Sequence, residues 1–154
     1  MPRAWRLCRR RYATSAFDGE GARLSGGRWN QAGIPVVYVS ATVSLAALEA
    51  FVHMDPDEAP EDLVVIPVGI PDDLALTVIG VRGLRRNWRS TPAPPSLQRI
   101  GSEWARDGKT AVLSVPSAVV PQERNYLLNP RHPEFSRIET GKPELFHLDP
   151  RLRK

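Results

Sequence analysis

Cysteine is almost absent from this chain, since Cys8 is the only one among 154 residues. A single cysteine excludes an internal disulfide and fits a reducing compartment, so we expect a cytoplasmic protein. The three histidines, His53, His132 and His147, lack the spacing of metal ligands, so no zinc site is expected. No apolar run approaches the roughly 18 residues of a membrane helix, and none of signal-peptide length follows the basic N-terminus. We therefore expect neither a metal centre nor a membrane segment.

A large excess of either charge is also lacking. Lys and Arg total 21 and Asp and Glu total 17, which leaves a net charge of +4. This tilt is too mild to indicate nucleic-acid binding alone, and it fits an anionic small ligand or an acidic protein partner equally well. No Walker-type loop and no glycine fingerprint of a dinucleotide fold follows a predicted strand, so Rossmann-type binding is not supported.

What the chain does contain is typical of a globular domain. Hydrophobic residues make up 42% and charged residues 25%, so disorder is not indicated, and we expect a single domain over residues 1–154. The 15 prolines are about twice the usual share of roughly 5%. We therefore expect short elements joined by long ordered loops, and not a helical bundle.

The hydrophobic patterns predict a mixed order of strands and helices. Because this order shows no regular βαβ alternation, it favours an α+β fold over a doubly wound one. Pro67 interrupts one predicted strand and indicates an edge position or a bulge there. We predict strands at residues 4–12, 36–40, 63–70 and 111–115, a further strand or turn at 118–121, one or two closing strands near the C-terminus, helices at 43–54 and 96–106, and loops at 17–27, 80–95 and 125–133.

Residues 23–49 are the stretch around which the chemistry is organised. A glycine loop ends there in Arg28, where Gly26 and Gly27 would let the backbone approach a ligand closely. A guanidinium binds phosphate oxygens in pairs, so this loop could hold an anionic phosphate. The alternative is a turn that carries an exposed arginine, because a glycine pair followed by arginine is a weak signal by itself.

Two further side chains of this stretch allow two interpretations each. Glu49 is a lone acid on an otherwise apolar predicted helix, and His53 lies four residues further on the same face. It could belong to a solvated polar stripe, or it could face a cationic transition state such as the oxocarbenium ion of a breaking glycosidic bond. Tyr38 alternates with Val37 and Val39 and so points to the opposite face, where it could stack on a flat base or fill the core.

Four segments together resemble the RES domain. They are Arg23-Leu-Ser-Gly-Gly-Arg-Trp-Asn, Gly33-Ile-Pro-Val-Val-Tyr, Leu45-Ala-Ala-Leu-Glu and Val115-Pro-Ser-Ala-Val-Val-Pro-Gln-Glu-Arg-Asn-Tyr-Leu-Leu-Asn-Pro-Arg-His-Pro. The resemblance covers roughly residues 5 to 140, and several ordered motifs make it more specific than any one of them. The family is named for an arginine, a glutamate and a serine, which by motif would be Arg28, Glu49 and Ser117 here.

The resemblance implies a fold, an activity and partners. RES proteins are similar in fold to ADP-ribosyltransferase toxins, which implies a compact mixed sheet with flanking helices. They are toxins of RES–Xre toxin–antitoxin pairs and consume NAD⁺ as a substrate, not as a bound cofactor. Some hydrolyse it, some phosphorolyse it with phosphate as co-substrate, and some are reported to ADP-ribosylate a protein. The expected partners are an Xre-type DNA-binding antitoxin and a second copy of the chain.

The resemblance also implies roles for single residues. Arg28 would hold a phosphate or a ribose of NAD⁺, and Tyr38 would stack on the nicotinamide. Glu49 would hold the nicotinamide ribose and stabilise the oxocarbenium ion, while Ser117 would bond to the nicotinamide or its ribose. Further NAD-binding candidates are Asn30, Asn125 and Asn129, with Arg23 as an alternative to Arg28 in the phosphate role.

Residues 80–95 match nothing in the resemblance. Four arginines surround Trp88 there, at positions 82, 85, 86 and 89, and could bind RNA or an acidic antitoxin segment, although such runs are mostly solvated. Three functions therefore remain open. They are an NAD⁺ glycohydrolase or phosphorylase, a protein ADP-ribosyltransferase with the same site, and a non-catalytic basic module. His132 could border the pocket or lie on the surface.

Overall fold

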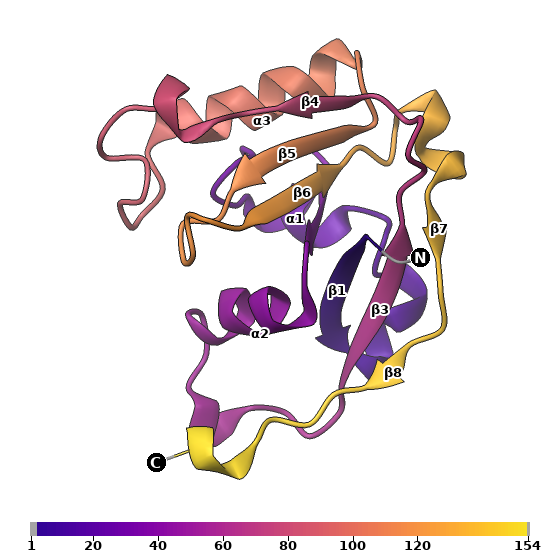
Figure 1. Cartoon of the computed structure of the whole chain (residues 1–154), viewed down its shortest axis with the longest axis vertical. Coiled ribbons are helices and arrows are strands. Elements are labelled where there is room, and N and C mark those ends of the chain that lie inside the picture. The colour runs from indigo at the N-terminus through magenta and orange to yellow at the C-terminus, as the bar shows by residue number, and fades with distance from the viewer. Residues whose placement is uncertain (1–2, 154) are drawn as a thin grey trace.

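One twisted mixed sheet runs through the protein, as a computed structural model shows for residues 3–153 (Figure 1). Residues 1, 2 and 154 of the predicted single domain lie outside the described part. The strand order is β4-β5-β6-β2-β1-β3-β7, and β8 also pairs with β3. Only β4 and β5 pair in parallel. The strands are β1 Ala4–Arg9, β2 Val37–Ser40, β3 Leu63–Gly69, β4 Leu76–Val78, β5 Val112–Pro116, β6 Arg124–Leu128, β7 Glu139–Thr140 and β8 Glu144–Leu145.

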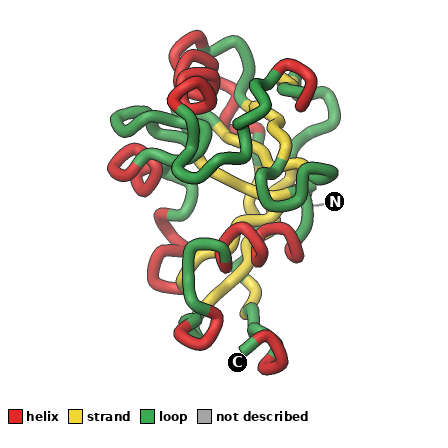
Figure 2. The backbone as a smooth tube through the Cα atoms, turned by 90° about the vertical axis from the view of Figure 1, so that its left-hand side faces the viewer, coloured by secondary structure: helices red, strands yellow, loops and turns green. Residues whose placement is uncertain are grey.

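Short helices and turns surround this sheet (Figure 2). In Figure 1, α3 lies along β4 and β5 at one end of the molecule, and α2 lies beside β1 and β2. The α-helices are α1 Glu20–Ser25, α2 Val43–Phe51 and α3 Pro95–Asp107, and the 3-10 turns are η1 Arg10–Ser15, η2 Pro56–Glu58, η3 Val81–Gly83, η4 Pro133–Arg137 and η5 Pro150–Leu152. The predicted α+β class is confirmed.

The side chains of the sheet alternate between two buried clusters, as the pleat of a strand requires. In β2, Val37 and Val39 join the cluster on one face, whereas Tyr38 packs against the cluster on the other. In β6, Leu128 and Leu127 divide in the same way. The predicted orientation of Tyr38, opposite to its valine neighbours, is therefore confirmed.

Helix α3 covers the face of the sheet toward which Tyr38 points. Leu97 and Trp104 are buried in the same cluster as Leu113 of β5, and Ile100 packs against it. These three α3 residues recur at helical spacing and so form one apolar face. The helix ends at Gly108, which takes a left-handed φ of 64° and donates its N–H to the Trp104 carbonyl.

Helix α2 begins with a side-chain cap. Its first turn is capped by Thr42, whose Oγ1 accepts from the Leu45 N–H at 3.0 Å. Leu45, Ala46 and Ala47 are the buried residues of the helix. The helix ends at Phe51, three residues earlier than predicted.

Several predicted boundaries were wrong. Residues 17–27 are not all loop, because they include α1, and residues 125–133 are not all loop, because β6 extends through Leu128. The first strand ends at Arg9, and β4 was not predicted, whereas residues 118–121 form bends and a turn, which agrees with the turn alternative of the prediction. Pro67 lies within β3 between the segments that pair with β7 and β8, so its missing N–H falls where the outer pairing is interrupted.

Candidate active site

Three adjacent central strands, β5, β6 and β2, have neighbouring ends on one side of the sheet. The antiparallel register places Asn125, near the start of β6, opposite Ser40 at the end of β2 and opposite Val115 near the end of β5. Helix α2 starts soon after β2, and its residue Glu49 lies beside these strand ends, where it bonds to Asn125. Residues far apart in the sequence therefore meet where β2 and β5 end.

The carboxylate of Glu49 is the centre of this group. Its Oε2 accepts a hydrogen bond from Ser117 Oγ at 2.9 Å and another from Asn125 Nδ2. Asn125 is held in turn through its Oδ1, which accepts from Ser40 Oγ at 2.7 Å. Among residues 3–153, no side chain bonds to Oε1 of Glu49. The half-buried carboxylate is therefore fixed through one oxygen and keeps the other for a ligand.

Ser117 can act only as a donor to Glu49. Its side chain is fully buried, and its Oγ accepts from the N–H groups of Val119 and Val120 at 3.1 and 3.0 Å. A hydroxyl has one proton and two acceptor positions, so the proton is left for Glu49. The turn after β5 therefore orients the hydroxyl before any ligand binds.

Arg28 approaches the group from the glycine loop. Gly26 has a φ of 71°, and the Gly27 N–H donates to the Asn30 carbonyl at 3.0 Å, so residues 26–30 form a tight turn. Nη1 of Arg28 donates to the carbonyl oxygens of Trp88 and Ser90 at 3.0 and 2.9 Å. The turn and these two carbonyls fix the direction of the side chain.

The pKa of Arg28 reflects the charges around it. Burial lowers the pKa of the Arg28 guanidinium, and the Glu49 carboxylate and the Tyr38 hydroxyl oppose that change. Arg89 acts in the same direction as burial, since a second positive charge disfavours the first. Arg28 therefore stands within electrostatic range of one acid and one further cation.

Tyr38 and Asn30 bond to each other. Tyr38 Oη donates to Asn30 Oδ1 at 2.6 Å and accepts from the Trp29 N–H at 3.1 Å. Burial raises the pKa of Tyr38, although its hydrogen-bonded neighbours oppose the increase. Asn30 is fully buried, and its Nδ2 donates to the carbonyls of Ala22 and Ile34 at 3.0 and 3.1 Å. Asn30 therefore ties the glycine loop together and has no amide proton directed at a ligand.

Helix α3 supports this loop from behind, through residues that the sequence did not single out. Gln98 Nε2 donates to the Gly27 carbonyl at 3.0 Å, and Ser102 Oγ accepts from the Gln31 N–H at 2.9 Å. A Cβ built on Gly101 would overlap the carbonyl oxygen of Trp29. The one available signal was a glycine in the middle of a strongly periodic helix, which indicates a close approach of backbone.

The remaining predicted residues lie elsewhere. Arg23 forms an ion pair with Glu20 on the surface of α1, and none of its contacts within residues 3–153 reaches Glu49. Asn129 is buried and donates to the Ala105 carbonyl at 3.0 Å, which joins the end of β6 to α3. His132 is also buried, and its Nδ1 accepts from the Glu134 N–H at 3.0 Å, so it caps η4.

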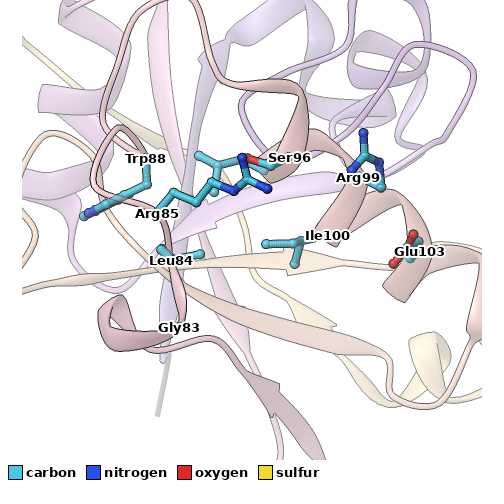
Figure 3. A pocket seen from close by; sticks show the side chains of 9 residues that line it. Gly83, Leu84, Arg85, Trp88, Ser96, Arg99, Ile100 and Glu103 are labelled. Carbon is cyan, nitrogen blue, oxygen red and sulfur yellow. The ribbon is translucent and has the colours of Figure 1, made fainter.

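A cavity of about 200 Å³ lies between residues 83–88 and α3 (Figure 3). None of the predicted NAD-binding residues lines it. We therefore locate the candidate active site by the convergence of side chains on Glu49. The cavity is lined by Gly83, Leu84, Arg85, Trp88, Ser96, Leu97, Arg99, Ile100 and Glu103.

The described residues offer little to a metal ion. Among residues 3–153, no three His, Cys, Asp or Glu side chains come together in a way that could hold one. Within the same residues, no helix has the length and hydrophobicity needed to cross a bilayer.

Comparison with known proteins gives a consistent result. A family model described as the RES domain matches residues 3–149. A protein of Photorhabdus laumondii named Toxin Res is 40% identical over 151 residues, which cover 97% of this chain and 96% of that protein. The Prs ADP-ribosylating toxin of Sphingobium is 36% identical, with 96% of this chain and 94% of that protein covered.

A solved structure agrees in fold. A chain of the crystal structure of the M. tuberculosis MbcT–MbcA toxin–antitoxin complex superimposes with a TM-score of 0.72, covering 92% of this chain and 81% of that one. Sequence identity is 17%, so this likeness concerns the fold alone.

Proposed function

The chain belongs to the RES-domain family, and from this premise we propose that it is a toxin that breaks the nicotinamide–ribose bond of NAD⁺. The observation that carries the proposal is the carboxylate of Glu49, held by Ser117 and Asn125 with Arg28 in electrostatic range. A fixed acid beside a fixed guanidinium suits a substrate that is anionic at its phosphates and becomes cationic at its reacting carbon.

The reaction itself needs little proton transfer. The bond between C1′ of the ribose and the ring nitrogen breaks, and its electron pair moves to the nitrogen. Nicotinamide leaves as a neutral molecule, and the ribose becomes an oxocarbenium ion. An acceptor then adds its lone pair to C1′ and loses a proton. Because the leaving group is neutral, no strong general acid is required.

Glu49 would supply the main stabilisation. Two donors hold its Oε2, so the carboxylate does not need to reorient when positive charge develops on the ribose. Its Oε1 could accept from a ribose hydroxyl. Ser117 and Asn125 are then positioning residues that act through Glu49, and NAD⁺ is a substrate and not a resident cofactor.

Arg28 would bind a phosphate of the substrate. Its Nη1 donates to two carbonyls, and within residues 3–153 no acceptor bonds to its Nε. Its Nη2 donates to Thr91 Oγ1 at 3.4 Å, which uses one of the two N–H groups of that nitrogen. Nε and Nη2 form the edge by which a guanidinium can hold two oxygens of one phosphate. Arg23 is paired on α1, so the geometry favours Arg28 for this role. Tyr38, with its hydroxyl fixed by Asn30, would offer its ring face to the nicotinamide.

The acceptor separates two versions of the proposal. Water gives a glycohydrolase, and phosphate gives a phosphorylase. The name of the Sphingobium relative favours a second candidate function, in which a protein side chain accepts the ADP-ribose from the same site. The shared chemistry up to the oxocarbenium ion is identical in all three.

The proposal includes partners. The relatives named Toxin Res and the fold shared with a chain of a toxin–antitoxin complex support an Xre-type antitoxin that neutralises this chain. Assembly as a homodimer remains part of the same proposal and follows from the family resemblance alone.

Glu49→Gln is the direct test. The variant keeps the shape of the side chain and removes its charge, so nicotinamide release from NAD⁺ should fall about 10²- to 10³-fold. Glu61→Gln, a change at an exposed acid, should leave release unchanged and is the matched control. Circular dichroism should show both variants folded. Release at the wild-type rate in Glu49→Gln would remove Glu49 from the mechanism.

Two further measurements identify the acceptor and the alternative class. The mass of the ribose product with and without phosphate distinguishes hydrolysis from phosphorolysis, and labelled NAD⁺ transferred to lysate protein indicates ADP-ribosylation. Intact NAD⁺ together with RNA binding that weakens steeply with salt would instead favour the non-catalytic basic module.

A further inference from the structure

The loop from Leu84 to Pro94 is the feature that the proposed function has not used. It carries Arg89, which is exposed, and its neighbours Trp88 and Ser90 supply the two carbonyls that hold Arg28. The side chain of Trp88 is buried in the cluster that α3 covers. The buried Trp88 side chain therefore anchors the loop, and the loop contacts Arg28 through two carbonyls.

The Arg89 side chain is fixed next to Ser117, on the side of the candidate site opposite the glycine loop. Its Nε donates to the carbonyl oxygen of Ala118 at 2.8 Å. Ala118 directly follows Ser117, which donates to Glu49. The loop thus spans from Arg28 to the turn after β5 and places a second guanidinium between them.

The two guanidinium groups are not neutralised. Within residues 3–153, neither Arg28 nor Arg89 forms a salt bridge, although six arginine–carboxylate pairs occur elsewhere. Arg89 is near enough to lower the pKa of the Arg28 guanidinium. Both Nη groups of Arg89 lack a hydrogen-bond partner in the same range. Arg28 keeps an unpaired Nε and Arg89 keeps two unpaired Nη groups within the described residues, and neither has a carboxylate in direct contact. Two such adjacent cations fit a ligand that carries two linked negative charges.

We propose that Arg89 binds the second phosphate of a dinucleotide diphosphate and so makes the site selective for dinucleotides over mononucleotides. Arg28 is half-buried and within electrostatic range of Glu49, so it takes the phosphate joined to the nicotinamide ribose. Arg89 is exposed at the rim and takes the phosphate on the adenosine side. This assignment deepens the proposed function and rests on it.

The test compares NAD⁺ with nicotinamide mononucleotide, which has the same scissile bond and only one phosphate. In Arg89→Ala, KM for NAD⁺ should rise about 10- to 100-fold, the worth of a hydrogen bond between charged groups. The value of kcat should stay unchanged, because the phosphate is bound equally in ground and transition states. For the mononucleotide, kcat/KM should be unchanged. An equal loss on both substrates, or no loss on NAD⁺, overturns the proposal.

Two companion variants separate charge from loop structure. Arg89→Lys keeps the positive charge and should recover part of the affinity for NAD⁺, which a purely structural role of Arg89 would not predict. Arg86→Ala removes an exposed arginine of the same loop that has no carboxylate partner within residues 3–153, and it should match the wild type on both substrates. An equal rise of KM in Arg86→Ala contradicts a specific site at Arg89.

Calorimetry with ADP-ribose and AMP distinguishes failure of this proposal from failure of the proposed function. If the wild type releases no nicotinamide but binds ADP-ribose, and Arg89→Ala weakens that binding without affecting AMP, the diphosphate site stands and the reaction is wrong. If ADP-ribose binds both forms equally, Arg89 is not a diphosphate ligand. If ADP-ribose does not bind the wild type, both proposals fail.

Discussion

The hydroxyl of Ser117 illustrates how backbone groups can orient a side chain before the substrate binds. Two backbone N–H groups occupy its acceptor positions, so its proton is directed at Glu49. Asn125 is set in the same manner by Ser40. The acid therefore meets its substrate with its orientation already chosen, which lowers the reorganisation needed as charge develops.

Tyr38→Phe should destabilise the fold without removing the aromatic face. The hydroxyl holds the buried Asn30 Oδ1 and the Trp29 N–H, and its loss leaves both without that partner. We expect the free energy of unfolding in urea to fall by about 1–3 kcal/mol. Tyr12→Phe, at an exposed tyrosine, should change it by less than about 0.5 kcal/mol. Equal stability of the two variants would contradict the structural role of the Tyr38 hydroxyl.

The sequence alone could suggest single residues of the site, but it could not predict that their side chains contact one another. Ser117 and Glu49 are separated by 68 positions, and Asn125 and Glu49 by 76, so no local pattern relates them. Their grouping was predicted from the family resemblance. Asn30 shows a second limit of the sequence, because its local pattern does not reveal which groups its side chain bonds to. A polar amide beside glycines resembles a ligand group, yet its donors are used by the loop's own carbonyls, which only the packed structure reveals.

At the scale of elements, α3 determines where the glycine loop stands. Its residues bond to the loop at Gly27 and Gln31, and its backbone approaches Trp29 without an intervening side chain. Because Trp29 is buried and directly follows Arg28, a shift of α3 would move the phosphate-binding guanidinium as well.

Gly101→Ala should therefore damage both stability and activity. The added methyl group overlaps the Trp29 carbonyl, so helix and loop must separate, at a cost of about 1–3 kcal/mol or more. Gly21→Ala is the matched control, because Gly21 is also helical and an added Cβ there meets nothing within 4 Å. Thermal unfolding and nicotinamide release measure both effects. A Gly101→Ala protein as stable and active as the wild type would refute the close packing of α3 on the loop.

The elements that the sequence predicted well have strong periodicity or clear ends. Helix α3 has both, and β2 has a β-branched run after Pro35. Helix α1 was missed because Gly19, Gly21 and Gly26 flank or interrupt it. Hydrogen bonds to its carbonyls from Gly33 N–H and Asn30 Nδ2 support it despite that weak propensity. Strand β6 was missed because asparagines indicate loops, whereas pairing with two neighbouring strands stabilises it.

For the whole molecule, the proposed toxicity predicts a phenotype. Production of the chain without an antitoxin should arrest growth of a bacterial host and deplete cellular NAD⁺, whereas Glu49→Gln should be tolerated at the same protein level. Glu61→Gln should remain toxic. Growth arrest with unchanged NAD⁺ and labelled host proteins would favour ADP-ribosylation, and undisturbed growth with abundant folded wild type would contradict the toxin assignment.

The contacts of residues 84–94 with the site carry an evolutionary consequence. Arg28 is held by the main-chain oxygens of Trp88 and Ser90, and Arg89 rests on the main-chain oxygen of Ala118. Every amino acid supplies the same carbonyl, so the two hydrogen bonds that hold Arg28 survive changes of side chain in the loop. Relatives could therefore exchange residue 89 and acquire a preference for a different nucleotide, while the guanidinium nearest the chemistry keeps its place.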